Sequence, residues 1–129
     1  MRKIESIKFK AKRLDNGEWV EGDLKHSTSY VGIGYPSSAF PDVPIVHRVD
    51  PSTVCQFTGL KDSEGKEIWE GDIVHDSYDR LCIDNLYEVV YIEEEGTFAF
   101  KSLDKVDNYE PFVNLFEVYV VGNKFDKEK

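Results

Sequence analysis

The chain has 129 residues, of which 40% are hydrophobic and 13% aromatic, and it carries a formal net charge of −9. This length fits one domain, and this hydrophobic content belongs to folded rather than disordered proteins. The acidic excess excludes a long-range positive field, so we expect no direct binding to a nucleic-acid backbone. Aromatic and β-branched residues recur along the chain, and this bias favours strands over helices.

The N-terminus and the cysteines indicate the cellular compartment. Charged residues follow Met1 directly, with no apolar segment of the signal-peptide kind, and no apolar run reaches membrane-spanning length. We therefore expect a cytoplasmic protein that does not contact a membrane. Cys55 and Cys82 both lie among apolar residues, which is typical of reduced thiols packed as small buried side chains.

The first predicted hairpin lies near the N-terminus. Residues 7–14 alternate between apolar and basic side chains, as a half-buried strand does. The turn sequence Asp15-Asn16-Gly17 follows, and a second strand is predicted over 18–21, ending at Gly22-Asp23.

A proline-rich segment covers residues 27–53 and holds four of the five prolines. Proline lacks the N–H that a sheet needs, so we expect a long loop with short edge strands around 30–33 and 45–49. Long structured loops often bind partners, and the apolar and aromatic residues of this one are the candidate binding residues. A mobile surface loop without a binding role is the alternative. The candidates are Tyr30, Ile33, Tyr35 and Phe40.

The rest of the chain alternates short strand patterns with Gly, Asn and Asp turns. The predicted fold class is all-β, with mostly short antiparallel strands and little helix, arranged as a small barrel or as two packed SH3-like β-subdomains. We expect one domain over 1–129, with subdomains at 1–53 and 54–123 as the divided alternative, and a frayed tail at 124–129. A helical turn fits only around 104–109 or 114–116. The further strands are predicted at 54–58, 66–69, from 73 onward, 86–93, 97–101 and 116–121.

One short motif occurs twice. NGEWVEGDL at 16–24 resembles GKEIWEGDI at 65–73, which indicates either two related subdomains or convergence on common turn chemistry. Glycine permits a positive φ and aspartate can hold a turn through backbone amides, so we interpret the repeated Glu-Gly-Asp as structural. The residues assigned to this structural turn motif are Gly22, Asp23, Gly59, Gly71 and Asp72.

No catalytic motif is recognisable in the sequence. There is no nucleophile elbow and no phosphate-binding glycine loop, and His26, His47 and His75 are widely spaced. A zinc or acid–base site is conceivable only if His47 and His75 meet Asp72 or Asp76 in space. We therefore expect no catalytic residue, no metal and no cofactor.

Several stretches resemble the YopX family, whose members are encoded by phages and prophages. These stretches are MRKI at 1–4, KFKA at 8–11, Trp19 with GDL at 22–24, QFTGLKDSEGKEIWEGDIV at 56–74 and VVGN at 120–123. The resemblance implies a phage-derived, cytosolic, mostly-β protein that tends to associate with itself, and it carries over no catalytic residue. The chain departs from the family pattern at 33–48, where the proline-rich segment is longer than the usual link.

Three functions remain open at this point. The first is a non-catalytic binding or homo-oligomeric assembly module that acts on itself and on a phage or host protein. The second is an acidic decoy that imitates DNA and inhibits a host DNA-binding protein, which the net charge of −9 motivates. The third is a metal-dependent hydrolase built on the histidines.

Overall fold

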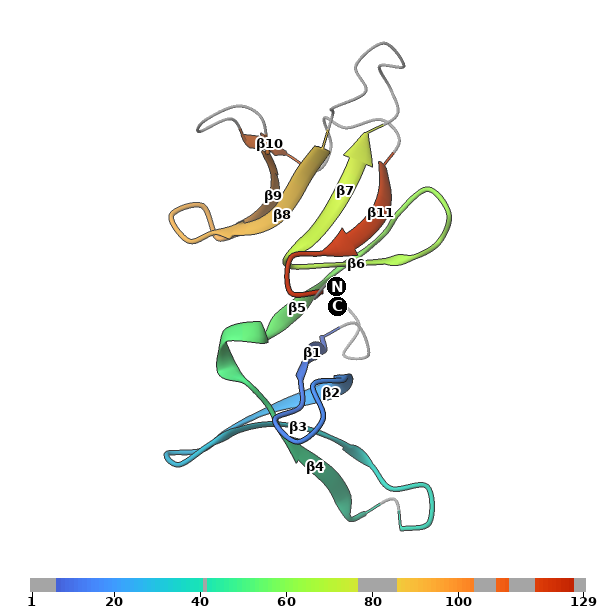
Figure 1. Cartoon of the computed structure of the whole chain (residues 1–129), viewed down its shortest axis with the longest axis vertical. Helices are drawn as coiled ribbons and strands as arrows, with labels where there is room; N and C mark the ends of the chain where they lie inside the picture. The colour runs from blue at the N-terminus through green and yellow to red at the C-terminus, as the bar shows by residue number, and fades with distance from the viewer. Residues whose placement is uncertain (1–6, 41, 77–85, 104–108, 112–117, 127–129) are drawn as a thin grey trace. The chain divides into compact units, whose positions relative to one another are not determined.

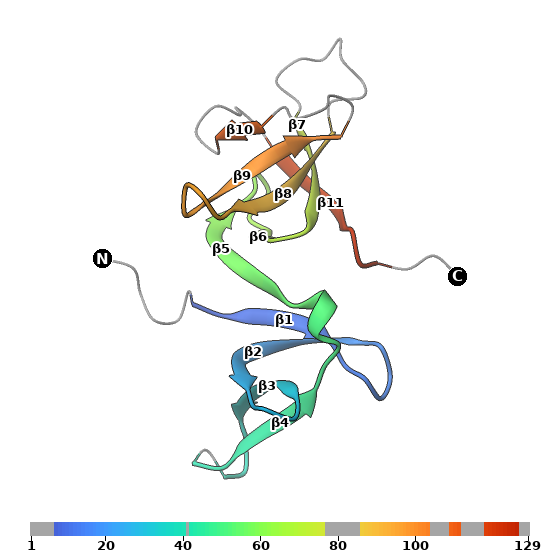
Figure 2. The same cartoon turned by 90° about the vertical axis from the view of Figure 1, so that its left-hand side faces the viewer.

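The chain forms two compact units, unit 1 up to Phe57 and unit 2 from Thr58. The computed structural model, drawn in Figures 1 and 2, describes residues 7–40, 42–76, 86–103, 109–111 and 118–126. Within these residues the regular structure consists of strands and one short 3-10 helix, so the predicted all-β class is confirmed. The strands form two antiparallel sheets, and their pairings do not show a closed barrel. The sequence predicted one domain, and its divided alternative placed the boundary after residue 53.

Unit 1 contains a meander of antiparallel strands, which follow one another in space in the order β4-β3-β2-β1-β5. β5 continues past the division into unit 2, where β6 is its neighbour in the same sheet. The elements are β1 (Phe9–Lys12), β2 (Trp19–His26), β3 (Val31–Pro36), β4 (Pro44–Arg48), the 3-10 helix η2 (Pro51–Thr53) and β5 (Cys55–Lys61).

The first hairpin is formed as predicted, with β1 and β2 paired around a turn in which Gly17 has a φ of 74°. The strand β2, however, runs on to His26 and does not end at Gly22-Asp23 as expected. Gly22 lies so close to β3 that a Cβ at this position would collide with the backbone carbonyl of Gly34. The glycine therefore allows two strands to approach within the sheet and does not terminate one.

The two short strands predicted around 30–33 and 45–49 are present as β3 and β4, but they pair into a β-hairpin and do not flank a long loop. β3 pairs with β4 over five residues, including Ile33 opposite His47 and Tyr35 opposite Ile45. Pro36 and Pro44 face each other where the paired strands end. Proline is tolerated at strand ends and on edge strands, and β4 is the edge of its sheet, so these prolines limit the hairpin without preventing it.

Unit 2 contains an antiparallel sheet in the order β10-β9-β8-β7-β11. The hairpin of β8 and β9, which the sequence predicted, is visible in Figure 2. The short strand β10 lies in a segment expected to be a polar link. Cys82, residues 104–108 and residues 114–116 lie outside the described residues. The elements are β6 (Glu67–Trp69), β7 (Asp72–Asp76), β8 (Leu86–Ile92), β9 (Thr97–Ser102), β10 (Tyr109–Pro111) and β11 (Val118–Asn123).

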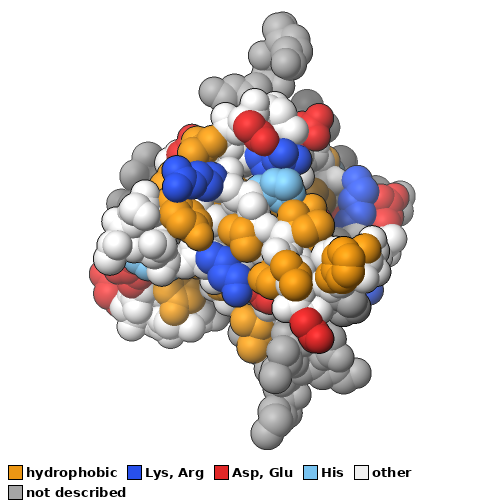
Figure 3. Space-filling model, turned by 90° about the horizontal axis from the view of Figure 1, so that it is seen from below, with side chains coloured by type: hydrophobic (Ala, Val, Ile, Leu, Met, Phe, Trp, Pro, Cys, Tyr) orange, Lys and Arg blue, Asp and Glu red, His pale blue; other side chains and the backbone are white. Residues whose placement is uncertain are grey.

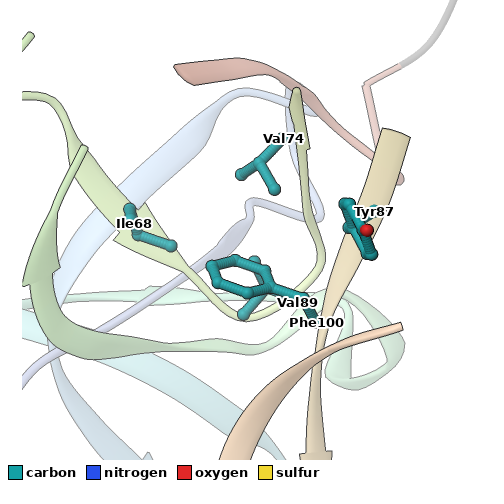
Figure 4. Close-up of a cluster of buried hydrophobic side chains, with 5 residues drawn as sticks. All are labelled: Ile68, Val74, Tyr87, Val89 and Phe100. Atoms are coloured by element: carbon teal, nitrogen blue, oxygen red, sulfur yellow. The ribbon is translucent and has the colours of Figure 1, made fainter. Parts of the chain in front are cut away.

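Each unit has its own hydrophobic core. In unit 1, Ala11, Ile33 and Val49 are buried, and half-buried apolar side chains from β1, β2 and β3 surround them. In unit 2 the buried cluster comes from β6, β7, β8 and β9, as Figure 4 shows. It consists of Ile68, Val74, Tyr87, Val89 and Phe100. No helix in the described part of the chain is both long and apolar enough to span a membrane.

Candidate functional site

The Glu-Gly-Asp turn at residues 70–72 is a structural junction. The Asp72 side chain is only 2% exposed. One carboxylate oxygen accepts a hydrogen bond from the backbone N–H of Trp69 at 2.7 Å, and the other accepts one from the side-chain amide of Asn123 at 2.9 Å. A carboxylate held in this way fixes the turn between β6 and β7 and is not presented to a substrate.

Gly71 joins this turn to two further strands. Its φ is 86°, a left-handed conformation that favours glycine. Its N–H donates to the carbonyl of Val89 on β8, and its carbonyl accepts from the N–H of Lys124 after β11, both at 2.8 Å. The two glycine motifs that the sequence shows at 70–72 and 122–123 therefore meet in space. Residues 124–126 are held by this and neighbouring hydrogen bonds, whereas the sequence predicted that the tail frays from 124.

The other residues of the structural turn motif have different roles. Gly59 has a φ of 88° and open space around it, so its backbone conformation is what requires glycine. Asp23 is exposed on β2, in contrast to the buried Asp72. The two copies of Glu-Gly-Asp thus occupy different local structures, one inside a strand and one in a turn.

Asp62 is a structural carboxylate that sequence reasoning treated only as part of a turn. One oxygen accepts from the N–H groups of Glu64 and Lys66, both at 2.8 Å, and the other accepts from the N–H of Val120 at 2.9 Å. Burial by itself raises the pKa of Asp62. The N–H groups of Val120, Lys66 and Glu64 outweigh burial and hold this pKa below its ordinary value. The group therefore serves as an anion that ties the turn after β5 to β11.

The histidines offer no metal site within the described residues, where no three His, Cys, Asp or Glu side chains are arranged to hold an ion. His26 lies at the exposed end of β2, His47 on β4 and His75 on β7. His47 is engaged by the hydroxyl of Tyr35, 3.0 Å from its Nε2. Asp72, the suggested acidic partner, is committed to the turn.

The four predicted binding residues divide between the core and the surface. Ile33 is fully buried in the core of unit 1, so it does not form part of an exposed surface. Tyr30 and Tyr35 are half-buried, and the guanidinium of Arg48 lies 4.7 Å from the ring centre of Tyr30. Phe40, at the tip of the hairpin, is 69% exposed and is the one member of the set with an open side chain.

Exposed apolar side chains gather at the same hairpin. Beside Phe40, the side chains of Val43, Ile45 and Val46 are 61%, 38% and 39% exposed. We call Phe40, Val43, Ile45 and Val46 the hairpin patch. Figure 3, seen from the side where β4 lies in Figure 1, shows hydrophobic side chains across the middle of the view, with lysine or arginine and histidine side chains among them and acidic ones mostly toward the rim. Pro44 is typical of an edge strand and thus signalled this exposure in the sequence, but Val43, Ile45 and Val46 were not recognised.

The hairpin patch lies in the least charged stretch of the chain. The whole sequence contains 16 basic and 25 acidic residues. Residues 27–47 contain a single acidic side chain, Asp42, and no lysine or arginine. Within this stretch the apolar side chains are therefore interrupted by only one charged side chain.

Comparison with known proteins places the chain in a family. The family model described as YopX protein matches residues 1–128. The fold is similar to the crystal structure of protein EF1440 from Enterococcus faecalis, with a TM-score of 0.52 and 22% identity over 91% of this chain and 92% of that one. A search of curated proteins found no match. Because the family model covers nearly the whole length, including the junction of Gly71, Asp72 and Asn123, the chain belongs to the YopX family.

Proposed function

We propose that this protein is a non-catalytic binding and assembly module whose contact surface is the hairpin patch. The observation that carries the proposal is the concentration of four exposed apolar side chains on the hairpin that ends in the edge strand β4. Clustered exposed apolar residues mark interaction sites in soluble proteins. An edge strand adds backbone N–H and C=O groups that a second strand can pair with.

Natural proteins protect edge strands with charges, and β4 lacks this protection along most of its length. Its residues are Pro44, Ile45, Val46, His47 and Arg48, so only the last carries a fixed charge. Lysine or glutamate at positions 45 and 46 would discourage pairing, whereas isoleucine and valine favour it. The composition of this edge therefore supports a role in contact with another chain.

The size of the hairpin patch favours a moderate affinity. Complete burial of one large apolar side chain contributes about 1.5–3 kcal/mol, and the members of the patch are partly buried already. Association itself costs roughly 4–15 kcal/mol, because the two molecules lose translational and rotational freedom. The patch alone therefore supports a concentration-dependent contact, and backbone hydrogen bonds along β4 must add to it.

The charge of the patch distinguishes this proposal from the acidic decoy. A decoy would engage a basic partner through carboxylates, and its binding would weaken steeply as salt is added. Contact through an uncharged patch persists in high salt, and between two copies that each carry a net charge of −9 it strengthens as repulsion is screened. The salt dependence of binding thus separates the two functions.

The test compares the wild-type protein with two lysine variants by sedimentation velocity at several concentrations and at low and high salt. Ile45→Lys places a charge in the hairpin patch. Leu103→Lys is the matched control, because Leu103 is also a surface residue, 50% exposed, but lies after β9 in unit 2. We expect association, with itself or with an added partner, to be lost in Ile45→Lys and kept in Leu103→Lys. Equal association by both variants would disprove the role of the patch.

A further inference from the structure

The orientation of the backbone along β4 determines which groups it offers to another chain. Val49 donates its N–H to the carbonyl of Val31 at 3.0 Å, and Ser37 donates to the carbonyl of Val43 at 3.4 Å. In an antiparallel pair, residues that bond to the neighbouring strand alternate with residues whose N–H and C=O point away from it. The backbone N–H and C=O groups of the odd-numbered residues from 43 to 49 therefore point toward β3. The backbone groups of the even-numbered residues Pro44, Val46 and Arg48 point away from β3, toward the open edge of the sheet.

This outer edge is open over only a short distance. Pro44 has no N–H, so it offers only its carbonyl. Leu14 lies opposite Arg48 and donates its N–H to the Arg48 carbonyl at 3.0 Å, next to the bridge between Arg13 and Val49. Within the described residues, the outward groups without a hydrogen-bond partner are the N–H and C=O of Val46, the C=O of Pro44 and the N–H of Arg48, and the last of these lies beside Leu14. A long added strand would collide with Leu14, so the partner must be short at this edge.

We infer that the partner at this edge is a second copy of the chain, with the two β4 strands antiparallel about a twofold axis at Ile45. This inference rests on the proposed function and specifies its partner. In this register the N–H of Val46 from each copy donates to the carbonyl of Pro44 in the other copy. Two hydrogen bonds result, and each copy uses the same surface, as a twofold interface requires.

The neighbouring registers are less favourable. An axis at Val46 places Pro44 of the second copy opposite Arg48, in the position that Leu14 occupies. An axis at Pro44 places two proline carbonyls opposite each other with no donor between them. The axis at Ile45 avoids both problems, because the residue opposite Val46 is then Pro44 and strand pairing stops before Arg48.

The side chains at the axis suit a contact between identical copies. Directly opposite residues in a non-hydrogen-bonded pair have their Cβ atoms about 4.5–5.5 Å apart, so the two Ile45 side chains would pack against each other. Ile45 is 38% exposed and has apolar surface to bury. The charged side chains beside this edge are of both signs, because Asp42 and Arg48 flank it in sequence and the Lys25 side chain lies over Gly34 together with Val46, so the net charge of −9 is not concentrated here.

Oxidative cross-linking tests the register in the full-length protein. Ile45→Cys and Val46→Cys are each made in a Cys82→Ser background. The Cys82→Ser protein without a further change is the control. Cys55 is retained because it is 1% exposed. Both are treated with diamide in the same conditions. With the axis at Ile45, the two thiols of an Ile45→Cys dimer lie within disulfide reach, while the two Val46 positions are diagonal neighbours about 7–8 Å apart and lie outside it. We expect Ile45→Cys to form covalent dimer about tenfold faster than Val46→Cys.

Each other result has a defined meaning. Faster cross-linking of Val46→Cys would place the axis at Val46 and overturn the inferred register, while the proposed function would stand. Self-association of the background protein without cross-linking at either position would also overturn it. The Cys82→Ser protein could instead stay monomeric and bind another protein, with that binding abolished by Ile45→Lys. This result would show that the partner is not a second copy, and the proposed binding module would stand.

Discussion

The carboxylate of Asp62 accepts a hydrogen bond from the backbone N–H of Val120 at 2.9 Å, across 58 residues of the chain. The same side chain accepts from the N–H groups of Glu64 and Lys66. A second contact strengthens the link, because Ser63 donates its N–H to the carbonyl of Val118 at 3.0 Å. One aspartate thus closes its own turn and holds the last strand of unit 2.

Replacing this aspartate tests its structural role. Asp62→Ala removes the acceptor of three backbone N–H groups, and we expect a loss of about 2–4 kcal/mol in the free energy of unfolding. Urea unfolding followed by tryptophan fluorescence measures it. Glu94→Ala is the control, because Glu94 is an exposed carboxylate in the turn between β8 and β9, and it should change stability by less than about 0.5 kcal/mol. Equal effects of the two substitutions would contradict the role.

The lowered pKa of Asp62 predicts a dependence of stability on pH. Because the pKa is lower in the folded state than in the unfolded state, the stabilisation is complete above the unfolded value of about 3.9 and is lost as the pH falls through the folded value. Urea unfolding between pH 7 and pH 2.5 should show stability declining below about pH 4. Asp62→Asn cannot gain a proton there, so its decline should be smaller. Parallel curves for both proteins would show that other groups cause the decline.

The hydrogen bond between Asp72 and Asn123 predicts that a second buried carboxylate at position 123 lowers the free energy of unfolding. Asn123→Asp would put two carboxylates where the structure has a hydrogen bond of 2.9 Å between side chains that are 2% and 7% exposed. We expect a destabilisation of about 3 kcal/mol or more at pH 7. Repulsion raises the pKa of one of the paired carboxyls, so the loss relative to wild type should shrink as the pH is lowered from 7 into the acidic range. A loss that is constant across this pH range would argue against carboxylate repulsion.

Two glycine substitutions separate crowding from backbone conformation. Gly22→Ala would place a Cβ against the carbonyl of Gly34, and Gly17→Ala would place one in open space at a φ of 74°. The change at Gly17 should cost about 1 kcal/mol. The change at Gly22 should cost more, because the backbones of β2 and β3 must move apart. Comparison of the two unfolding free energies checks this, and a smaller loss for Gly22→Ala would refute the close approach.

Because the N–H of Val46 points away from β3, replacing Val46 with proline should weaken association without preventing folding. In Val46→Pro the lost donor faces away from β3, so we expect the hairpin to fold, as it does with Pro44. Both intermolecular hydrogen bonds would be lost, and self-association should weaken about tenfold to a hundredfold. Val46→Thr keeps the shape and the N–H and should still associate. Circular dichroism and sedimentation equilibrium give the two readouts, and a folded Val46→Pro that associates as well as wild type would exclude this edge.

The proline-rich segment shows how far sequence reasoning reaches in this protein. Four prolines predicted irregular structure, and the edge strands were expected at 30–33 and 45–49. The structure pairs β3 and β4 there, because Pro36 and Pro44 fall where the paired strands end and the missing N–H of Pro44 faces away from β3. The positions of prolines in a sequence show which backbone N–H groups are missing. Only the pairing of the strands shows whether those N–H groups would have been needed for hydrogen bonds within the sheet.

The same limit applies to the binding residues. Tyr30, Ile33, Tyr35 and Phe40 were grouped because they are apolar and lie in one segment, yet Ile33 is core and Phe40 is surface. Alternation along a strand separates its two faces without saying which face is covered. That outcome depended on β1 and on Val49, which pack on the same side as Ile33.

The sequence by itself determined the local features: the turns at glycine and asparagine, the strands between them, the all-β class and the resemblance to the YopX family. These features depend on residues close together in the chain, where the strand period and turn chemistry act directly. Tertiary structure alone decided that Asp62 reaches Val120, that Asp72 binds Asn123 and that Ile45 and Val46 remain exposed on an edge. These contacts join residues far apart in the chain, and only the packing of strands determines which polar groups find partners and which apolar faces stay open.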